Sequence, residues 1–123
     1  MCQKGRAWIE LSRENLAHNV RELQRILPKH TAMMPAIKAN AYGHGAALVG
    51  KALQDMGISD FCVATVQEGI ELRLAGITGQ ILVLGYTHPS QFNELAHYNL
   101  VQTVIDYPYA QVLNDYGKAL PVH

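Results

Sequence analysis

The sequence predicts an α/β fold with parallel strands, and three observations lead to that class. Short apolar runs without polar alternation recur along the chain, which is typical of strands that are covered on both faces. A helical pattern, usually ended by a glycine, follows these runs. Helices between successive strands are the crossovers that parallel strands need. We therefore expect a parallel sheet with helices packed on it.

The first part of the chain is predicted to hold a short strand and then a long helix. Residues 6–11 alternate loosely between polar and apolar types, which favours a strand. Ser12 is a good N-cap for the helix, and Pro28 would end it. The apolar face of this helix would be formed by Leu16, Val20, Leu23 and Leu27, which are spaced three or four residues apart.

Repeated strand and helix units are expected after Pro28. The predicted strands are residues 32–39, 61–65, 80–85 and 101–105. The predicted helices are residues 46–56, 66–75, 90–98 and 109–119. Residues 40–45 would form a loop that contains glycine, and a fifth strand would begin at residues 121–123. Pro35 conflicts with its strand, because proline removes a hydrogen-bond donor from the ladder.

Two architectures fit this order of elements, an open doubly wound sheet and part of a (β/α)8 barrel. The glycine fingerprints of dinucleotide and P-loop sites are absent, and the loop around His44 has the wrong spacing for them. A barrel needs eight units, commonly about 250 residues. The chain supplies about half of them. We therefore expect residues 1–123 to be one partial domain, the truncated first half of a TIM-type barrel.

Composition excludes several other classes of protein. Apolar residues make up 49% of the chain, which excludes a disordered segment. Ten basic and ten acidic residues give no net charge, so nucleic acid is not an expected partner. Two cysteines, Cys2 and Cys62, build neither a disulfide framework nor a four-ligand zinc site, and the six histidines lack zinc spacing. We expect no metal, no membrane segment and a cytoplasmic location.

Lys38 is the most unusual residue, because it ends the apolar run of residues 33–37. If that run is a parallel strand, Lys38 lies at its carboxyl end, where α/β proteins hold their active sites. A desolvated amine there would be a nucleophile able to form a Schiff base with an aldehyde. The alternative is that the side chain simply extends to water from the strand end.

The loop after Lys38 has two interpretations as well. Gly43 and Gly45 would let the backbone approach a bound phosphate closely, and the hydroxyl of Tyr42 could donate to that phosphate. The same residues would also suit an ordinary tight turn with both glycines at positive φ.

Residues 36–45, Ala-Ile-Lys-Ala-Asn-Ala-Tyr-Gly-His-Gly, resemble the pyridoxal 5'-phosphate (PLP) attachment segment of the alanine racemase family. The resemblance continues through residues 61–65, Glu68 and residues 81–85, and it covers essentially the whole chain. Residues 85–89 and 109–118 look most like the racemase domains of alanine/serine racemases from glycopeptide-resistant bacteria.

The resemblance implies a PLP-dependent isomerase that makes D-amino acids for cell-wall precursors. Lys38 matches the lysine that forms the Schiff base with PLP and acts as one of two acid/base groups, and Tyr42 matches the tyrosine that hydrogen-bonds the cofactor phosphate. Leu84 would line the cofactor pocket by packing. The family works as a homodimer with a second, β-rich domain. That domain, the rest of the barrel and the second base lie outside these 123 residues.

Our main hypothesis is therefore a fragment of a racemase for L- and D-alanine, or for L- and D-serine, that is inactive alone. The alternative is a non-catalytic PLP-binding carrier built on a similar barrel. Residues 40–45 favour the racemase. Glu68 and Glu71 are interpreted as a solvated helix face beside Arg73, and Cys62 as a small buried hydrophobic residue rather than a nucleophile.

Overall fold

The computed structural model describes residues 5–123, so Cys2 lies outside the described part, and the chain divides into units 1–31 and 32–123. The first unit holds α1 (Arg13–Ile26), and Ser12 caps it as predicted, since its hydroxyl accepts from the Asn15 amide at 3.1 Å. The predicted strand at residues 6–11 is wrong. The described residues of this unit contain no strand that could pair with it, and a strand needs a neighbour to satisfy its backbone groups.

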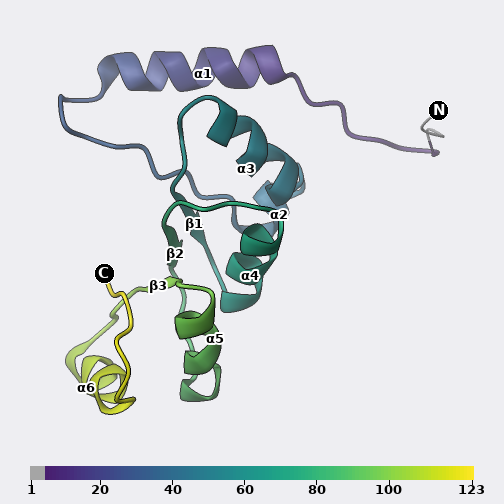
Figure 1. The fold of residues 1–123 in the computed structure, drawn as a ribbon. Coiled ribbons are helices and arrows are strands. Elements are labelled where there is room, and N and C mark those ends of the chain that lie inside the picture. Colours follow the sequence, from purple (N-terminus) through teal and green to yellow (C-terminus); the bar gives the residue numbers. More distant parts are fainter. Residues whose placement is uncertain (1–4) are drawn as a thin grey trace. The chain divides into compact units, whose positions relative to one another are not determined.

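The second unit is built around a parallel sheet (Figure 1). Its strands β1 (Phe61–Val63), β2 (Ile81–Val83) and β3 (Val101–Gln102) lie in chain order and are all parallel. Single parallel bridges add Ala36 beside β1 and Val122 beside β3. The prediction of a parallel α/β fold is confirmed, as is the beginning of a further strand near residue 122.

Helices connect the strands where they were predicted, and one further helix covers residues 38–42, of which residues 40–42 were expected to be loop. The sequence of elements is α2 (Lys38–Tyr42), α3 (Ala46–Asp55), α4 (Val66–Leu74), a 3-10 turn (Pro89–Gln91), α5 (Phe92–His97) and α6 (Tyr107–Asp115). In Figure 1, α3, α4 and α5 all lie on the same side of the strands. Helix α6 begins two residues before the predicted start because Asp106 caps it, with its carboxylate accepting from the Tyr109 amide at 2.8 Å.

The predicted strand at residues 32–39 is largely wrong, because only Ala36 pairs with a neighbour. The amide of Cys62 donates to Pro35 and the amide of Ile37 donates to Cys62, both at 2.9 Å. Pro35 has no N–H for a further bond on that side, which stops the ladder in one direction. In the other direction the chain leaves the strand at once, since α2 begins at Lys38.

One face of the sheet packs against helices and forms the core. Phe61 and Val63 of β1 and Ile81 and Val83 of β2 have no exposed surface. Helix α4 approaches this face closely, since a Cβ added at Gly69 would lie 3.5 Å from Ile81 Cγ2. The side chains between them in each strand point to the opposite face.

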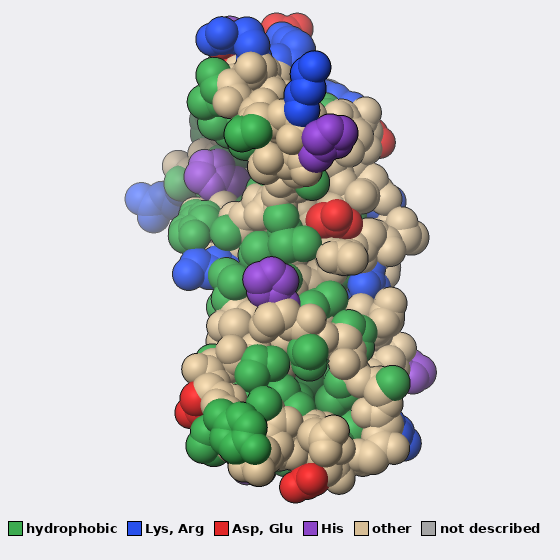
Figure 2. All heavy atoms as spheres, turned by 90° about the vertical axis from the view of Figure 1, so that its left-hand side faces the viewer, with side chains coloured by type: hydrophobic (Ala, Val, Ile, Leu, Met, Phe, Trp, Pro, Cys, Tyr) green, Lys and Arg blue, Asp and Glu red, His purple; other side chains and the backbone are tan. Residues whose placement is uncertain are grey.

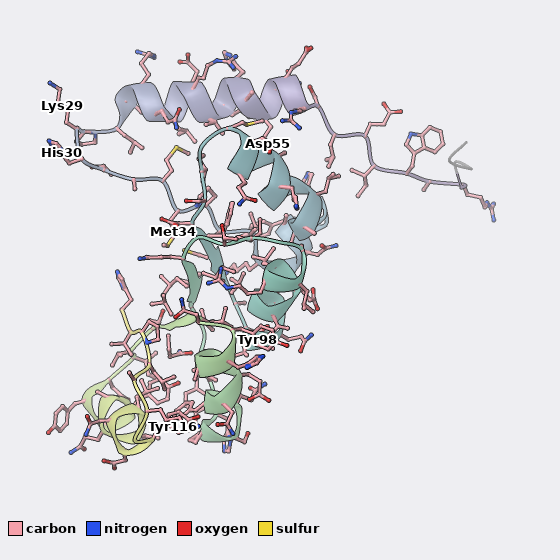
Figure 3. The ribbon with its side chains drawn as sticks, viewed as in Figure 1. Lys29, His30, Met34, Asp55, Tyr98 and Tyr116 are labelled. Atoms are coloured by element: carbon pink, nitrogen blue, oxygen red, sulfur yellow. The ribbon has the colours of Figure 1, made fainter. Side chains whose placement is uncertain are left out.

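The opposite face is only partly covered by the described residues. Ala36, Cys62, Leu82 and Val101 form one row across the sheet by register. Leu82 is 7% exposed, whereas Cys62 and Val101 are half-buried and Ala36 is exposed. Figure 2 views the molecule from this side, and hydrophobic side chains gather there. Met34 lies on the same side, away from α4 (Figure 3).

Arg73 connects several loops by hydrogen bonds, a role that was not predicted from the sequence. Its guanidinium donates to the carbonyls of Tyr98 at 2.8 Å, Ile77 at 2.9 Å, Gly79 at 2.6 Å and Asn99 at 2.9 Å. Burial lowers the pKa of this guanidinium from its usual range. Arg73 is therefore a structural residue of the second unit.

Among the described residues, no helix combines the length and the apolar character that crossing a bilayer requires.

Candidate functional site

The carboxyl ends of the strands meet at one edge of the sheet and form the candidate site. Four neighbouring segments reach this edge, namely the segment around Ala36 and strands β1, β2 and β3. Just beyond their paired residues lie Lys38, Ala64, Leu84 and Thr103, respectively. The Leu84 amide donates to Val63 at 2.8 Å and the Thr103 amide donates to Val83 at 3.1 Å, so the ladder continues to this edge. The predicted site residues Lys38 and Leu84 therefore lie on the same edge.

Lys38 is half-buried and begins α2, directly after Ile37, which is only 3% exposed. The residue thus lies at the carboxyl edge, where parallel sheets hold their ligand sites. Leu84 is 40% exposed at the same edge. An amine in this position can reach a ligand that lies above the strand ends.

Helix α2 is a left-handed turn made by residues other than glycine. Ala39, Asn40 and Ala41 have φ values of 50°, 54° and 53°, and Tyr42 has 53°. Such residues cost about 1–2 kcal/mol each in the left-handed helix. Gly43 ends the turn at a φ of 89°, so the expectation of positive φ at this glycine is confirmed. Strained backbone of this kind is concentrated at functional sites.

Hydrogen bonds on both sides of α2 hold this turn in place. The Ala41 amide donates to Ile37 at 2.9 Å, and the Gly43 amide donates to Ala39 at 3.1 Å. The side-chain oxygen of Asn40 accepts from the Ala46 amide at 2.8 Å, so it links the turn to the start of α3. The backbone between Lys38 and Tyr42 is therefore held in part by hydrogen bonds within its own loop.

Tyr42 lies at the end of the same turn and is 62% exposed. Its phenol is accessible to a ligand. Because only the left-handed turn separates the two residues, the geometry of that turn determines how the Lys38 amine and the Tyr42 hydroxyl are placed relative to each other.

Glu68 is the residue that sequence reasoning missed at this edge. One carboxylate oxygen accepts from the Ala39 amide at 2.9 Å, and the other accepts from the Ala64 amide at 2.7 Å. The interpretation of Glu68 as a solvated side chain is therefore wrong. A signal was present in the sequence, because Thr65 and Glu68 have the spacing of a capping box at the start of α4. The Thr65 hydroxyl does accept from the Glu68 amide, at 3.3 Å.

Two more side chains near this edge have distinct environments. The Cys62 thiol donates to Met34 at 3.6 Å, and burial raises the pKa of the thiol. This favours the unreactive form and agrees with the interpretation of Cys62 as a hydrophobic residue. The hydroxyl of Thr103 is buried and has no hydrogen-bond partner in the described part of the chain. It is therefore a polar atom at this edge whose hydrogen bond the described residues leave unmade.

Within residues 5–123, no three His, Cys, Asp or Glu side chains come together in a way that could hold a metal ion. The groups at the carboxyl edge are instead an amine and two hydroxyls, from Lys38, Tyr42 and Thr103. The amine can bond to a carbonyl carbon of an organic ligand, and the hydroxyls can donate hydrogen bonds to its anionic oxygens.

The parallel sheet, its crossover helices and the polar groups at its carboxyl edge define a parallel α/β protein with a candidate ligand site at the strand ends. The family described as "Alanine racemase, N-terminal domain" matches residues 11–123. The chain belongs to the alanine racemase family.

Individual relatives agree with this assignment. The chain is 47% identical over 117 residues to an amino-acid racemase of Enterococcus faecalis, covering 95% of this chain and 16% of that protein. It is 43% identical over 118 residues to a serine/alanine racemase of Enterococcus gallinarum, covering 96% of this chain and 17% of that protein. A solved alanine racemase of Clostridium difficile 630 superposes with a TM-score of 0.83 at 37% identity, covering 89% of this chain and 30% of that one.

The chain is thus similar over nearly its whole length to proteins that are much longer. It spans 16% and 17% of the two curated relatives and 30% of the solved structure.

Proposed function

We propose that this chain is the cofactor-attachment part of a longer PLP-dependent amino acid racemase, with Lys38 as the residue that binds the cofactor covalently. The observation that carries the proposal is that Lys38 is half-buried at the carboxyl edge of a parallel sheet, within a chain of the alanine racemase family. We propose that residues 1–123 form the first half of its (β/α)8 barrel, and that the whole enzyme is a homodimer.

The described residues fit PLP, which has an aldehyde and a phosphate group. Lys38 offers the primary amine that covalent attachment requires. Tyr42 is 62% exposed and offers a hydroxyl to the phosphate, and its position is fixed by the left-handed turn. Within residues 5–123 the buried hydroxyl of Thr103 has no hydrogen-bond partner, which suits an edge that is completed by a polar ligand.

When bound, PLP supplies an electron-withdrawing ring that makes the α-hydrogen of an attached amino acid acidic. Nζ of Lys38 would accept that proton on one face of the substrate and return a proton there when the reaction runs in reverse. The opposite face needs a second acid/base group, which we expect from residues outside this chain. Tyr42 would hold the cofactor in register by donating to its phosphate.

Alanine is the first substrate we propose, and serine is the second. Two observations support this choice. The solved structure reported above is an alanine racemase, and one of the relatives is a serine/alanine racemase. In either case the substrate would be a small free amino acid.

The test is a racemisation assay with the natural protein that contains this chain, supplied with PLP and either L-alanine or L-serine. We expect the D-amino acid to accumulate and Lys38→Ala to abolish its formation. Tyr42→Phe should raise the concentration of PLP needed for half-maximal activity by about tenfold, the effect of losing one hydrogen bond to a charged group. Attachment of PLP to Lys38 without formation of either D-amino acid would favour the non-catalytic carrier.

A further inference from the structure

We infer that Glu68 is a positioning residue for Lys38, because its carboxylate replaces two missing hydrogen bonds of the sheet beside the lysine. This inference rests on the proposed function of Lys38. Glu68 acts at the place where the segment around Ala36 separates from β1 (Phe61–Val63) and α2 begins.

The pairing of the two segments is regular up to Ile37. The Cys62 amide donates to Pro35, and the Ile37 amide donates to Cys62, both at 2.9 Å. In a parallel ladder the next two bonds would run from the Ala64 amide to Ile37 and from the Ala39 amide to Ala64. Those two bonds would pair Lys38 with Ala64 in the ladder.

The structure gives these backbone groups other partners. The carbonyl of Ile37 accepts from Ala41 at 2.9 Å, because the chain has entered the left-handed turn. The carbonyl of Ala64 accepts from Gly85 at 3.2 Å. The amides of Ala39 and Ala64 are left without ladder partners, and unpaired amides are costly where water is excluded.

Glu68 satisfies both amides at once. Its two carboxylate oxygens accept from Ala39 at 2.9 Å and from Ala64 at 2.7 Å. Hydrogen bonds to an ionised acceptor are shorter and stronger than those between neutral groups. The Glu68 side chain therefore joins Ala39, which follows Lys38, to Ala64, which follows β1.

The base of Glu68 is itself firmly placed. The residue lies in the first turn of α4 (Val66–Leu74), where the Thr65 hydroxyl accepts from its amide at 3.3 Å. Helix α4 packs on the sheet through the buried residues Val66, Gly69 and Leu72. The carboxylate thus fixes the Ala39 amide, next to Lys38, relative to helix α4. The same hydrogen bonds offset part of the strain in the left-handed turn.

The test compares Glu68→Gln with the wild-type full chain, using Glu71→Gln as the matched control on an exposed position of the same helix. Glutamine keeps one acceptor oxygen, but its NH2 group faces an amide that also donates. We expect hydrogen exchange at the Ala39 and Ala64 amides to accelerate by about tenfold or more, the effect of losing one charge-assisted bond. Exchange at the core amides of Ile81 and Val83 should stay unchanged.

A second readout measures the amine itself. The chain is incubated with PLP, reduced with borohydride, and digested, and the rate of labelling at Lys38 is divided by that at the exposed Lys51. We expect this ratio to fall about tenfold in Glu68→Gln, to stay at the wild-type value in Glu71→Gln, and to recover partly in Glu68→Asp, which keeps the charge.

The outcomes separate the two proposals. Exchange and labelling ratios in Glu68→Gln that equal the wild-type values would overturn the role of Glu68, and so would acceleration that is uniform across Ala39, Ala64, Ile81 and Val83. A wild-type chain that is labelled no faster at Lys38 than at Lys51 would instead contradict the proposed function of Lys38. The exchange data would then still decide whether Glu68 holds the two amides.

Discussion

The hydroxyl of Thr87 donates a 2.6 Å hydrogen bond to the side-chain oxygen of Gln102, and the two residues are 2% and 0% exposed. The amide group of Gln102 donates in turn to Gly85 at 2.8 Å and to Thr103 at 3.0 Å. The Tyr109 hydroxyl donates to the carbonyl of Thr87 at 2.8 Å. This buried network joins the loop after β2 to β3 and α6, immediately beside the candidate site.

Replacing Thr87 by valine should destabilise the fold by about 1–3 kcal/mol, because the buried oxygen of Gln102 then lacks a donor. Valine has nearly the same shape as threonine, so the loss of the hydrogen bond dominates the effect. Urea unfolding measures the free energy, and Thr78→Val at an exposed position is the control. Equal stability of Thr87→Val and wild type would show that the network contributes nothing.

Stability should fall as the pH rises above about 10, the ordinary pKa of tyrosine. Burial of the Tyr109 phenol raises its pKa, and the neighbouring Tyr86 raises it further, although hydrogen bonds with Thr87 act in the opposite direction. The folded state then holds its proton more tightly than the unfolded state, so the stabilisation is full below pH 10 and is lost through the folded pKa.

Urea titrations between pH 8 and pH 11 measure this slope. Tyr109→Phe should flatten it, whereas Tyr107→Phe, at a position that is 74% exposed, should keep the wild-type slope. A slope that survives in Tyr109→Phe would assign the effect to another group.

Replacing Arg73 by lysine should cost about 2 kcal/mol, although the charge is kept, because four carbonyls surround the planar guanidinium. The lysine ammonium carries all its N–H donors on one nitrogen, so it cannot reach all four carbonyls at once. Thermal or urea unfolding measures the loss. The control is Arg25→Lys, where the side chain is 70% exposed and pairs with Glu22. We expect less than about 0.5 kcal/mol there.

Cys62 should react slowly with thiol reagents at pH 8. Burial raises the pKa of its thiol, and the reactive thiolate is therefore rare. In a Cys2→Ser background, alkylation should run at least about tenfold more slowly than for glutathione, and denaturant should remove the difference. Reaction at the rate of a free thiol in the folded chain would show that Cys62 is exposed and activated.

Much of the fold could be predicted from the sequence, because the apolar runs that form β1, β2 and β3 are local signals. The helix caps at Ser12 and Thr65 are local signals as well. Residues 6–11 have the pattern of a strand, but a strand depends on a partner that no local pattern reveals. The strand prediction for residues 32–39 was largely wrong for a related reason, since Pro35 and the left-handed turn limit the pairing of this segment to one residue.

The candidate site was predicted in part. Lys38 and Tyr42 were recognisable from the motif around them, and both are on α2 at the carboxyl edge. The distant partners of Glu68 and Arg73 could not be predicted, because they are backbone groups up to 29 residues away, with no charged partner to mark them. Such contacts become visible only when the strands have been placed side by side.

The proposed role of Lys38 is tested most directly by identifying the lysine to which PLP becomes attached. The chain is mixed with PLP, reduced with borohydride and digested, and the modified lysine is identified by mass spectrometry. We predict that the label is found on Lys38, in the peptide that also contains Tyr42, and that Lys38→Ala removes it. A label spread evenly over Lys29, Lys51 and Lys118, with Lys38 unmodified, would contradict the account.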